Sequence, residues 1–363
     1  MPRNAASSME DAFLQTILDH PDDDMPRLVF ADWLEEHSNP RGAFIRLQCQ
    51  RAKLTPYDPG WKEMLSEEST LLKQFEAEWS KPVLRYVEAV HYRRGFVEHV
   101  RVSATKLLKN AERLFRSAPV RSIRLERVDR LAEIAECSWL ARVTELDLNR
   151  ELFGSRSLQT LIRSEHCRSL RVLRLDRCTL QATTIQMLAS AANLHVLQTL
   201  TLAGNALTEE SAASLANSPH LTSLRELNLS DNQLESAGAA ALCAAPTFQL
   251  TRLSLANNRI GNEGLGAIAR CPQLAQLRYL DLEKNSLANL GFEALIQSPH
   301  VGQLEYLNLA QNHISSRGVQ LLTDSSLLAG LSYLNLRNNE IDKATALTMP
   351  QRLRTPKMRE LLF

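Results

Sequence analysis

The 363-residue sequence contains no uninterrupted apolar run of about 18 residues, the length that a membrane-spanning helix requires. Residues 1–10 also lack the apolar core of a secretory signal, so we expect a cytoplasmic protein without a membrane segment. The six cysteines include no Cys-x-x-Cys pair of the kind that binds zinc or performs redox chemistry. We therefore expect free and mostly buried thiols.

Signatures of catalysis and of metal binding are missing as well. The nine histidines have no ligand spacing with cysteines or carboxylates, and no Gly-x-Ser-x-Gly nucleophile elbow occurs. The glycine-rich segment 261–266 is not followed by Lys-Ser/Thr, so it does not match a phosphate-binding loop. The acidic run Asp22–Asp24 lacks the glycine and the distal glutamate of a calcium loop. We expect no catalytic residue, no cofactor and no bound metal.

The net charge of +1 conceals an uneven distribution of charge along the chain. Residues 1–80 contain 8 Lys and Arg against 15 Asp and Glu, whereas residues 81–180 contain 21 against 12. The asymmetry indicates either two segments that dock on each other or a basic patch that attracts an anionic partner. We favour docking, because domains that bind nucleic acid are usually basic overall.

One pattern, Leu-x-x-Leu-x-Leu-x-x-Asn-x-Leu/Ile, recurs through the second half of the chain with a step of about 27 residues. Six full copies begin at Leu197, Leu224, Leu250, Leu277, Leu304 and Leu331. Partial copies precede them at Val97, Val120, Val143 and Leu170. The strand spacing returns once more at 358–363. The sequence therefore predicts ten repeats and a terminal strand.

Each copy is predicted to contain a strand and a helix. The fourth and sixth residues lie on one side of a short strand and enter the core, while the third, fifth and seventh face solvent. Parallel stacking of such strands requires a crossover, usually a helix. Thr208 before Glu209 predicts the start of one, with the Thr208 hydroxyl as its cap. Proline recurs 22 residues into several copies and predicts where the helices end, at Pro119, Pro219, Pro246, Pro272 and Pro299.

This pattern resembles the ribonuclease-inhibitor type of leucine-rich repeat. The resemblance implies an α/β horseshoe solenoid with a parallel sheet on its concave face and helices on its convex face. The array is expected to span residues 81–341, followed by a C-terminal cap with a terminal strand at 342–363. The Asn of each copy, replaced by Cys178 in one, is expected to satisfy buried backbone groups at the turn after the strand. We interpret this column as structural.

Residues 9–80 show helical patterns of apolar side chains and are predicted to form an all-α cap. The segments 26–36 (Pro-Arg-Leu-Val-Phe-Ala-Asp-Trp-Leu-Glu-Glu) and 41–48 (Arg-Gly-Ala-Phe-Ile-Arg-Leu-Gln) resemble the bacterial repeat-companion domain. That family is abundant in planctomycetes and precedes repeat arrays, and the weaker match extends to 94–97 (Arg-Gly-Phe-Val). The resemblance implies a partner for the repeats and no transferable activity.

The cap is expected to cover the open edge of the sheet. The predicted contacts are Trp79, Val83, Leu84 and Tyr86. Four charged residues of the cap could form a ligand site, although a salt-bridge network is the commoner explanation for such a group. Its members are Arg27, Asp32, Arg41 and Arg46.

Two groups of side chains are candidates for partner binding on the concave face. At the C-terminal end, Tyr279, Tyr306 and Tyr333 occupy the third position of consecutive repeats, about 5 Å apart on neighbouring strands. Polar neighbours are Asp281, Asn308, Asn335 and Arg337. Exposed aromatics ringed by polar groups are typical of binding hot spots, but neighbouring tyrosines also stabilise adjacent strands. At the other end the fifth position carries Arg101, Arg124 and Arg174, for which cross-strand ion pairing is the alternative to an acidic partner.

We expect a non-enzymatic scaffold for protein–protein interaction, because a solenoid offers a long surface and no natural pocket. The partner is unknown, and we expect a monomer. The alternative is a regulator or adaptor of an enzyme, of the GTPase-activating or ligase-adaptor type. Nucleic acid or carbohydrate is a less favoured ligand, since no aromatics alternate with the arginines.

Overall fold

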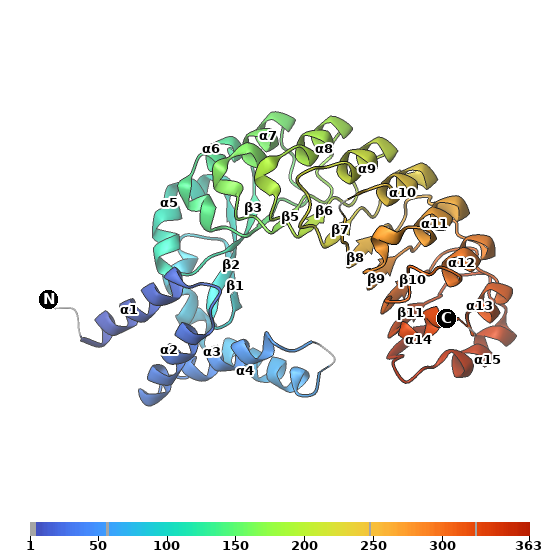
Figure 1. Cartoon of the computed structure of the whole chain (residues 1–363). Helices are drawn as coiled ribbons and strands as arrows, with labels where there is room; N and C mark the ends of the chain where they lie inside the picture. The colour runs from blue at the N-terminus through green and yellow to red at the C-terminus, as the bar shows by residue number, and fades with distance from the viewer. Residues whose placement is uncertain (1–4, 56–57, 247, 324) are drawn as a thin grey trace. The chain divides into compact units, whose positions relative to one another are not determined.

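The computed structural model describes residues 5–55, 58–246, 248–323 and 325–363, which divide into two compact units at Leu146 and Asp147. The elements of the first unit are α1 (Ala5–Asp19), α2 (Met25–Glu36), α3 (Arg41–Arg51), α4 (Trp61–Leu84), β1 (Ala89–Arg93), β2 (Phe96–Ser103), α5 (Ala104–Ser117), β3 (Ser122–Glu126) and α6 (Leu131–Ala135) (Figure 1). The strand β4 (Glu145–Asp147) lies at the boundary in the sequence.

The second unit alternates strands and helices, as the repeat pattern predicts. Its strands are β5 (Val172–Arg174), β6 (Thr199–Thr201), β7 (Glu226–Asn228), β8 (Arg252–Ser254), β9 (Tyr279–Asp281), β10 (Tyr306–Asn308), β11 (Tyr333–Asn335) and β12 (Glu360–Leu362). Its helices are α7 (Ser155–Arg163), α8 (Ala182–Ala189), α9 (Glu209–Ala216), α10 (Glu235–Cys243), α11 (Gly261–Ala269), α12 (Asn289–Ile296), α13 (Ser316–Leu322), α14 (Ser326–Gly330) and α15 (Lys343–Leu353). Within this unit the strands line one side and helices α8 to α13 line the other (Figure 1).

The register of the strands is the one that the repeat pattern predicts. From β5 to β12 the strands pair in parallel, and residues at the same repeat position face each other, as Leu253, Leu280 and Leu307 do. These leucines are at most 1% exposed. Burying one leucine side chain stabilises a fold by about 1.5–3 kcal/mol, so each added repeat extends the core. The predicted α/β repeat fold is confirmed.

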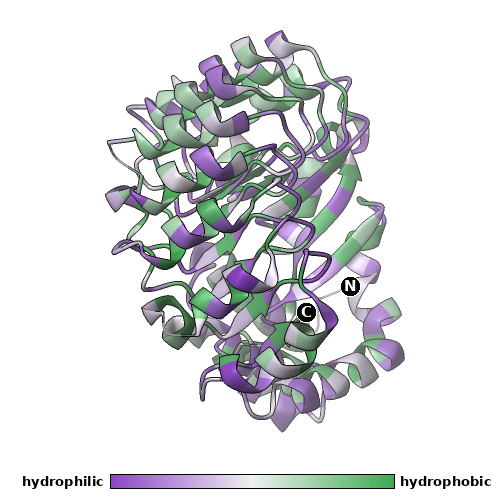
Figure 2. Ribbon diagram, turned by 90° about the vertical axis from the view of Figure 1, so that its right-hand side faces the viewer, coloured by the Kyte–Doolittle hydropathy of each residue, from purple (hydrophilic) through white to green (hydrophobic). Residues whose placement is uncertain are grey.

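The helices of the repeats end where the prolines predict. The last residues of α9 and α12, Ala216 and Ile296, each lie three positions before a proline. The prediction for the helix start is wrong in one detail, because Thr208 occupies the cap position of α9 but its hydroxyl makes no cap hydrogen bond. Figure 2 shows hydrophobic and hydrophilic residues along the same helices and strands, as is expected for elements with one buried face.

The first unit begins with the predicted helices and adds a strand that the sequence analysis missed. β1 pairs with β2 in antiparallel fashion, and β2 then pairs with β3 in parallel, so the first repeat strand is one arm of a hairpin. The helices pack on this hairpin through a buried cluster of Ile17, Phe30, Ala31, Leu34, Ile45, Cys49 and Phe96. Of the predicted cap contacts, Trp79 and Val83 are buried, Tyr86 is half-buried and Leu84 is 39% exposed.

Two glycines in the companion-like segments are required by close contacts of the backbone. A Cβ on Gly42 would lie 2.6 Å from the Ala31 carbonyl oxygen, so α2 and α3 can approach closely only with glycine there. Gly95 has a φ of +85°, and a Cβ there would lie 2.3 Å from Cγ1 of Ile45. The Arg-Gly-Phe turn of the hairpin therefore fits against α3 only because it contains glycine.

Candidate partner-binding surface

The three tyrosines predicted on the solvent-facing side of the sheet form one stack. Tyr279, Tyr306 and Tyr333, which we call the tyrosine strip, lie in register on β9, β10 and β11. Adjacent ring centroids are 4.1 Å apart, with interplanar angles of 14° and 5°. Each side chain is half-buried, so the ring edges remain open to solvent. Burial raises the pKa of Tyr306 above the ordinary tyrosine value, and the adjacent Tyr279 raises it further.

An arginine that the sequence analysis did not single out closes one end of the strip. The guanidinium carbon of Arg252 on β8 lies 4.1 Å from the Tyr279 ring centroid. The Arg252 Nε is 3.7 Å from the carboxylate of Glu226 on β7. Arg252 occupies the third position of the repeat before Tyr279, so the sequence places it in the same column, one strand earlier.

The polar neighbours of the strip are held by hydrogen bonds within the sheet. Asn308 is buried, donates to Glu283 at 3.0 Å and accepts from the Ala310 amide at 3.1 Å. Asp281 accepts from the Glu283 amide at 3.1 Å, and burial raises the pKa of its carboxyl. Asn335 accepts from the backbone amide of Arg337, whose side chain is exposed. The predicted residues on β9 to β11 are thus brought together around the tyrosine strip.

The three arginines of the other candidate surface are distributed over both units. Arg101 and Arg124 are in register on β2 and β3 of the first unit, and Arg174 lies on β5 of the second. Arg101 pairs with Glu126 on the neighbouring strand at 3.2 Å. This pairing favours the cross-strand alternative for that position.

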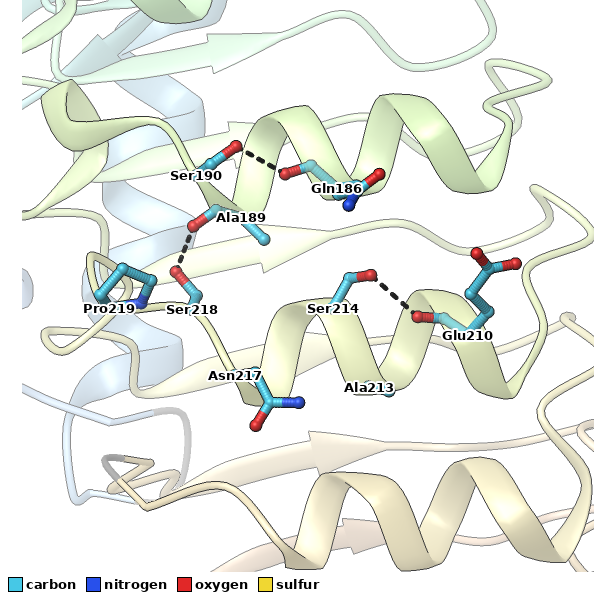
Figure 3. A pocket seen from close by; sticks show the side chains of 9 residues that line it. All are labelled: Gln186, Ala189, Ser190, Glu210, Ala213, Ser214, Asn217, Ser218 and Pro219. Carbon is cyan, nitrogen blue, oxygen red and sulfur yellow. Dashed lines mark hydrogen bonds between the residues drawn. The ribbon is translucent and has the colours of Figure 1, made fainter.

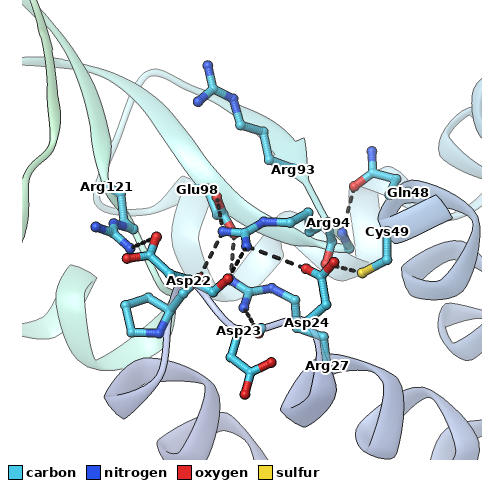
Figure 4. A network of polar contacts seen from close by, with 12 residues as sticks. Asp22, Asp23, Asp24, Arg27, Gln48, Cys49, Arg93, Arg94, Glu98 and Arg121 are labelled. Carbon is cyan, nitrogen blue, oxygen red and sulfur yellow. Dashed lines mark hydrogen bonds and ion pairs between the residues drawn. The ribbon is translucent and has the colours of Figure 1, made fainter. Parts of the chain in front are cut away.

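The charged residues of the companion-like segment do not form one site. Arg27 is fully buried and its guanidinium lies 2.6 Å from Glu98 of β2, which also accepts from Arg94 at 3.0 Å (Figure 4). Arg46 instead pairs with Asp32 and Glu35 in a partly exposed group. Arg41 lies over the Phe96 ring at 5.1 Å. Arg27 lies over the same ring at 5.7 Å, so Arg27 and Arg41 share Phe96, while Arg46 and Asp32 form a separate group. Arg27 ties α2 to the hairpin.

A hollow of about 370 Å³ lies on the helical side between α8 and α9 (Figure 3). Its hydroxyl groups bond to nearby backbone carbonyls: Ser190 donates to Gln186, and Ser214 donates to Glu210. These serines are committed to their own helices, so they do not converge on a ligand in the hollow. The tyrosine strip remains the stronger candidate surface.

Within the described ranges no group of three or more His, Cys, Asp or Glu side chains has the arrangement of a metal site. The helices of the same part of the chain include none with the length and apolarity to cross a membrane. The six cysteines are free, and four of them, Cys49, Cys167, Cys178 and Cys271, are buried.

Comparisons with known proteins agree with the repeat fold. A family model described as Leucine Rich repeat matches residues 220–243, 249–269 and 304–322. No curated protein matches the sequence. A chain from the yeast Rad7 and Elc1 complex has a TM-score of 0.55 at 16% identity, over 91% of this chain and 88% of its own.

Two other similar structures overlap less well. A chain of the TLR13–ssRNA13 complex has a TM-score of 0.40 at 18% identity, over 62% of this chain and 37% of its own. An internalin from Listeria monocytogenes has a TM-score of 0.37 at 18% identity, over 73% of this chain and 86% of its own.

Proposed function

We propose that this leucine-rich repeat solenoid is a non-enzymatic scaffold that binds a partner protein through the tyrosine strip. The observation that carries the proposal is the row of three stacked, half-buried rings on the solvent-facing side of β9 to β11. Tyrosine supplies a large contact area with little loss of conformational entropy, and stacking fixes these rings before a partner arrives. A surface that is already ordered loses less entropy on binding.

Asn308 and Asp281 support a binding role because their hydrogen bonds hold the polar border of the strip in place. Aromatic residues surrounded by satisfied polar groups are the usual composition of an interface centre. We further propose a cytoplasmic monomer, to which the free thiols are suited. The adaptor or enzyme-regulator function is a narrower form of the same proposal.

We propose that residues 9–80 act as a repeat-companion cap. Their buried cluster with Phe96 and the Arg27–Glu98 ion pair support this assignment, because both join the helices to the first hairpin of the sheet. An edge strand left uncovered tends to pair with other chains. The cap would then keep the array monomeric.

Photo-crosslinking tests the main proposal. A photoreactive amino acid is placed at Tyr306 in one variant and at Gln186, which is exposed on α8 of the helical side, in another. Both variants are irradiated in native lysate, and the adducts are identified by mass spectrometry. A protein captured at Tyr306 and absent at Gln186 is the expected result, and its binding is then measured with purified components. Equal adducts at both positions would overturn the proposal.

A further inference from the structure

The two ends of the tyrosine strip differ in a way that points to the chemistry of its partner. At one end the guanidinium of Arg252 lies over the ring of Tyr279 and forms an ion pair with Glu226. The chain therefore contains an example of the arrangement that the strip accommodates: aromatic face, guanidinium and carboxylate. A guanidinium stacks on an aromatic ring and pairs with a carboxylate at the same time, which an ammonium does less well.

At the other end an aromatic face and a carboxylate are also present, but on adjacent strands, β11 and β12, whereas the strand of Arg252 separates Glu226 from Tyr279. Tyr333 stacks on Tyr306 with one face, and in the described ranges no ring or cation is placed on its other face. The next residue in register, on β12, is Glu360, whose side chain is exposed. Among the described residues Glu360 forms no ion pair.

Two further carboxylates, Asp281 and Glu283, belong to the repeat of Tyr279 and give the strip as a whole a negative border. Glu283 accepts amide hydrogen bonds from Asn308 at 3.0 Å and from Gln311 at 2.6 Å. Neither Glu283 nor Asp281 has an ion pair in the part of the chain that the structure describes. Arg337 follows β11 and Arg359 precedes Glu360, so both add positive charge at the C-terminal end of the strip, where a single guest cation fits better than a long basic segment.

Resting on the proposed function, we propose that the tyrosine strip recognises an arginine side chain of the partner protein. The guanidinium stacks on the outer face of Tyr333 and pairs with the carboxylate of Glu360. The partner's arginine would thus contact one aromatic face and one carboxylate at the C-terminal end of the stack, as Arg252 does at the other end. A lysine at that place would keep the charge and lose most of the stacking.

A random 12-residue peptide library displayed on phage tests this inference with the full chain as bait. The wild-type protein is expected to enrich peptides with one arginine in a fixed place. The Tyr333→Leu variant should lose that enrichment and Glu360→Gln should reduce it, whereas Glu263→Gln, which removes an exposed charge from α11 on the helical side, should keep it. Circular dichroism checks that each variant is folded.

Calorimetry on one selected peptide gives the magnitude. Replacing its arginine by lysine should weaken binding about five- to tenfold, the range of a desolvated cation–aromatic contact. Glu360→Gln should weaken it about two- to fivefold, as for one exposed ion pair.

Two other outcomes overturn the inference in distinguishable ways. Peptides without arginine that still require the tyrosine strip would refute arginine recognition and leave the scaffold function standing. Enrichment that survives replacement of Tyr279, Tyr306 and Tyr333 by alanine would refute both.

Discussion

The backbone amide of Asn258 donates to the side-chain oxygen of Asn285, 27 residues later, at 3.0 Å. The same oxygen accepts from the Ile260 amide at 3.2 Å, and the Asn285 amide group donates to the Leu255 carbonyl at 2.9 Å. One buried side chain thus satisfies three backbone groups of the preceding repeat. This is the structural role predicted for the asparagine column, and it is confirmed.

Replacing Asn285 with leucine should destabilise the array, because it leaves these buried backbone groups without partners. We expect a cost of about 1–3 kcal/mol for each group that finds no new partner. Urea unfolding followed by circular dichroism measures the change. The control is Asn217→Ala, since Asn217 is exposed after α9 and its replacement should stay within about 0.5 kcal/mol. Equal midpoints for the two variants would show that the column does not stabilise the fold.

Leu255→Ala tests the register of the repeats. Leu255 is fully buried, so its truncation should cost about 2–5 kcal/mol through lost burial and the resulting cavity. Leu290 on α12 is 73% exposed, and Leu290→Ala serves as the matched control with little expected effect. A midpoint for Leu255→Ala as high as that of the wild type would contradict the register.

Glu98→Gln tests how the cap is held on the hairpin. Glu98 is the shared acceptor of Arg27 and Arg94, and loss of its charge leaves buried guanidinium without an anion. We expect Glu98→Gln to lower the free energy of unfolding by about 3–5 kcal/mol. The control, Glu112→Gln, breaks an ion pair with Arg116 in which both side chains are 77% exposed, and should cost less than about 1 kcal/mol. Thermal unfolding that is unchanged in Glu98→Gln would show that the network does not hold the cap.

Asp281 gives a pH-dependent prediction. Burial raises the pKa of Asp281 above its unfolded value, so the native state binds this proton more tightly than the unfolded state. Its contribution to stability therefore grows as pH falls through the interval between the two pKa values, and is lost at neutral pH. Asp281→Asn should raise the melting temperature at pH 7 and have little effect below the unfolded pKa.

Asp342 is the control of opposite sign. Its carboxylate accepts from the Thr345 amide at the start of α15, and the Ser316 hydroxyl and this amide hold the pKa of Asp342 at about 2. This stabilisation is present above the unfolded pKa and is lost as pH falls toward about 2. Asp342→Asn should therefore lower the melting temperature at pH 7. If both variants shifted in the same direction at pH 7, the account of these two carboxyls would be wrong.

The repeat fold could be predicted from the sequence because each copy states its own strand, core and turn. The positions of Leu253 and Leu280 in the core follow from a repeat pattern that recurs in each neighbouring copy. The strand β1 was missed because it pairs in antiparallel fashion and lies outside the period. The Arg27–Glu98 pair joins residues that are 71 positions apart, and no local pattern specifies such a contact.

The candidate surface was predictable in part. The register alone placed Tyr279, Tyr306 and Tyr333 side by side. The stacking of Arg252 on Tyr279 depends on the side-chain conformation of a long residue, which the sequence does not fix. The same register placed Glu360 after Tyr333, as the pairing of β12 with β11 shows, and its contact with a partner is a proposal.

The most direct test of the binding proposal is the affinity of the crosslinked partner, once purified, for the wild-type chain and for the variant with Tyr279, Tyr306 and Tyr333 changed to alanine. Loss of the three rings should weaken the complex at least about thirtyfold, because even a single central interface aromatic contributes about 2 kcal/mol or more. The variant should remain folded, since cross-strand pairs contribute only about 0.2–1 kcal/mol each. A folded variant that binds the partner as tightly as the wild type would contradict the account.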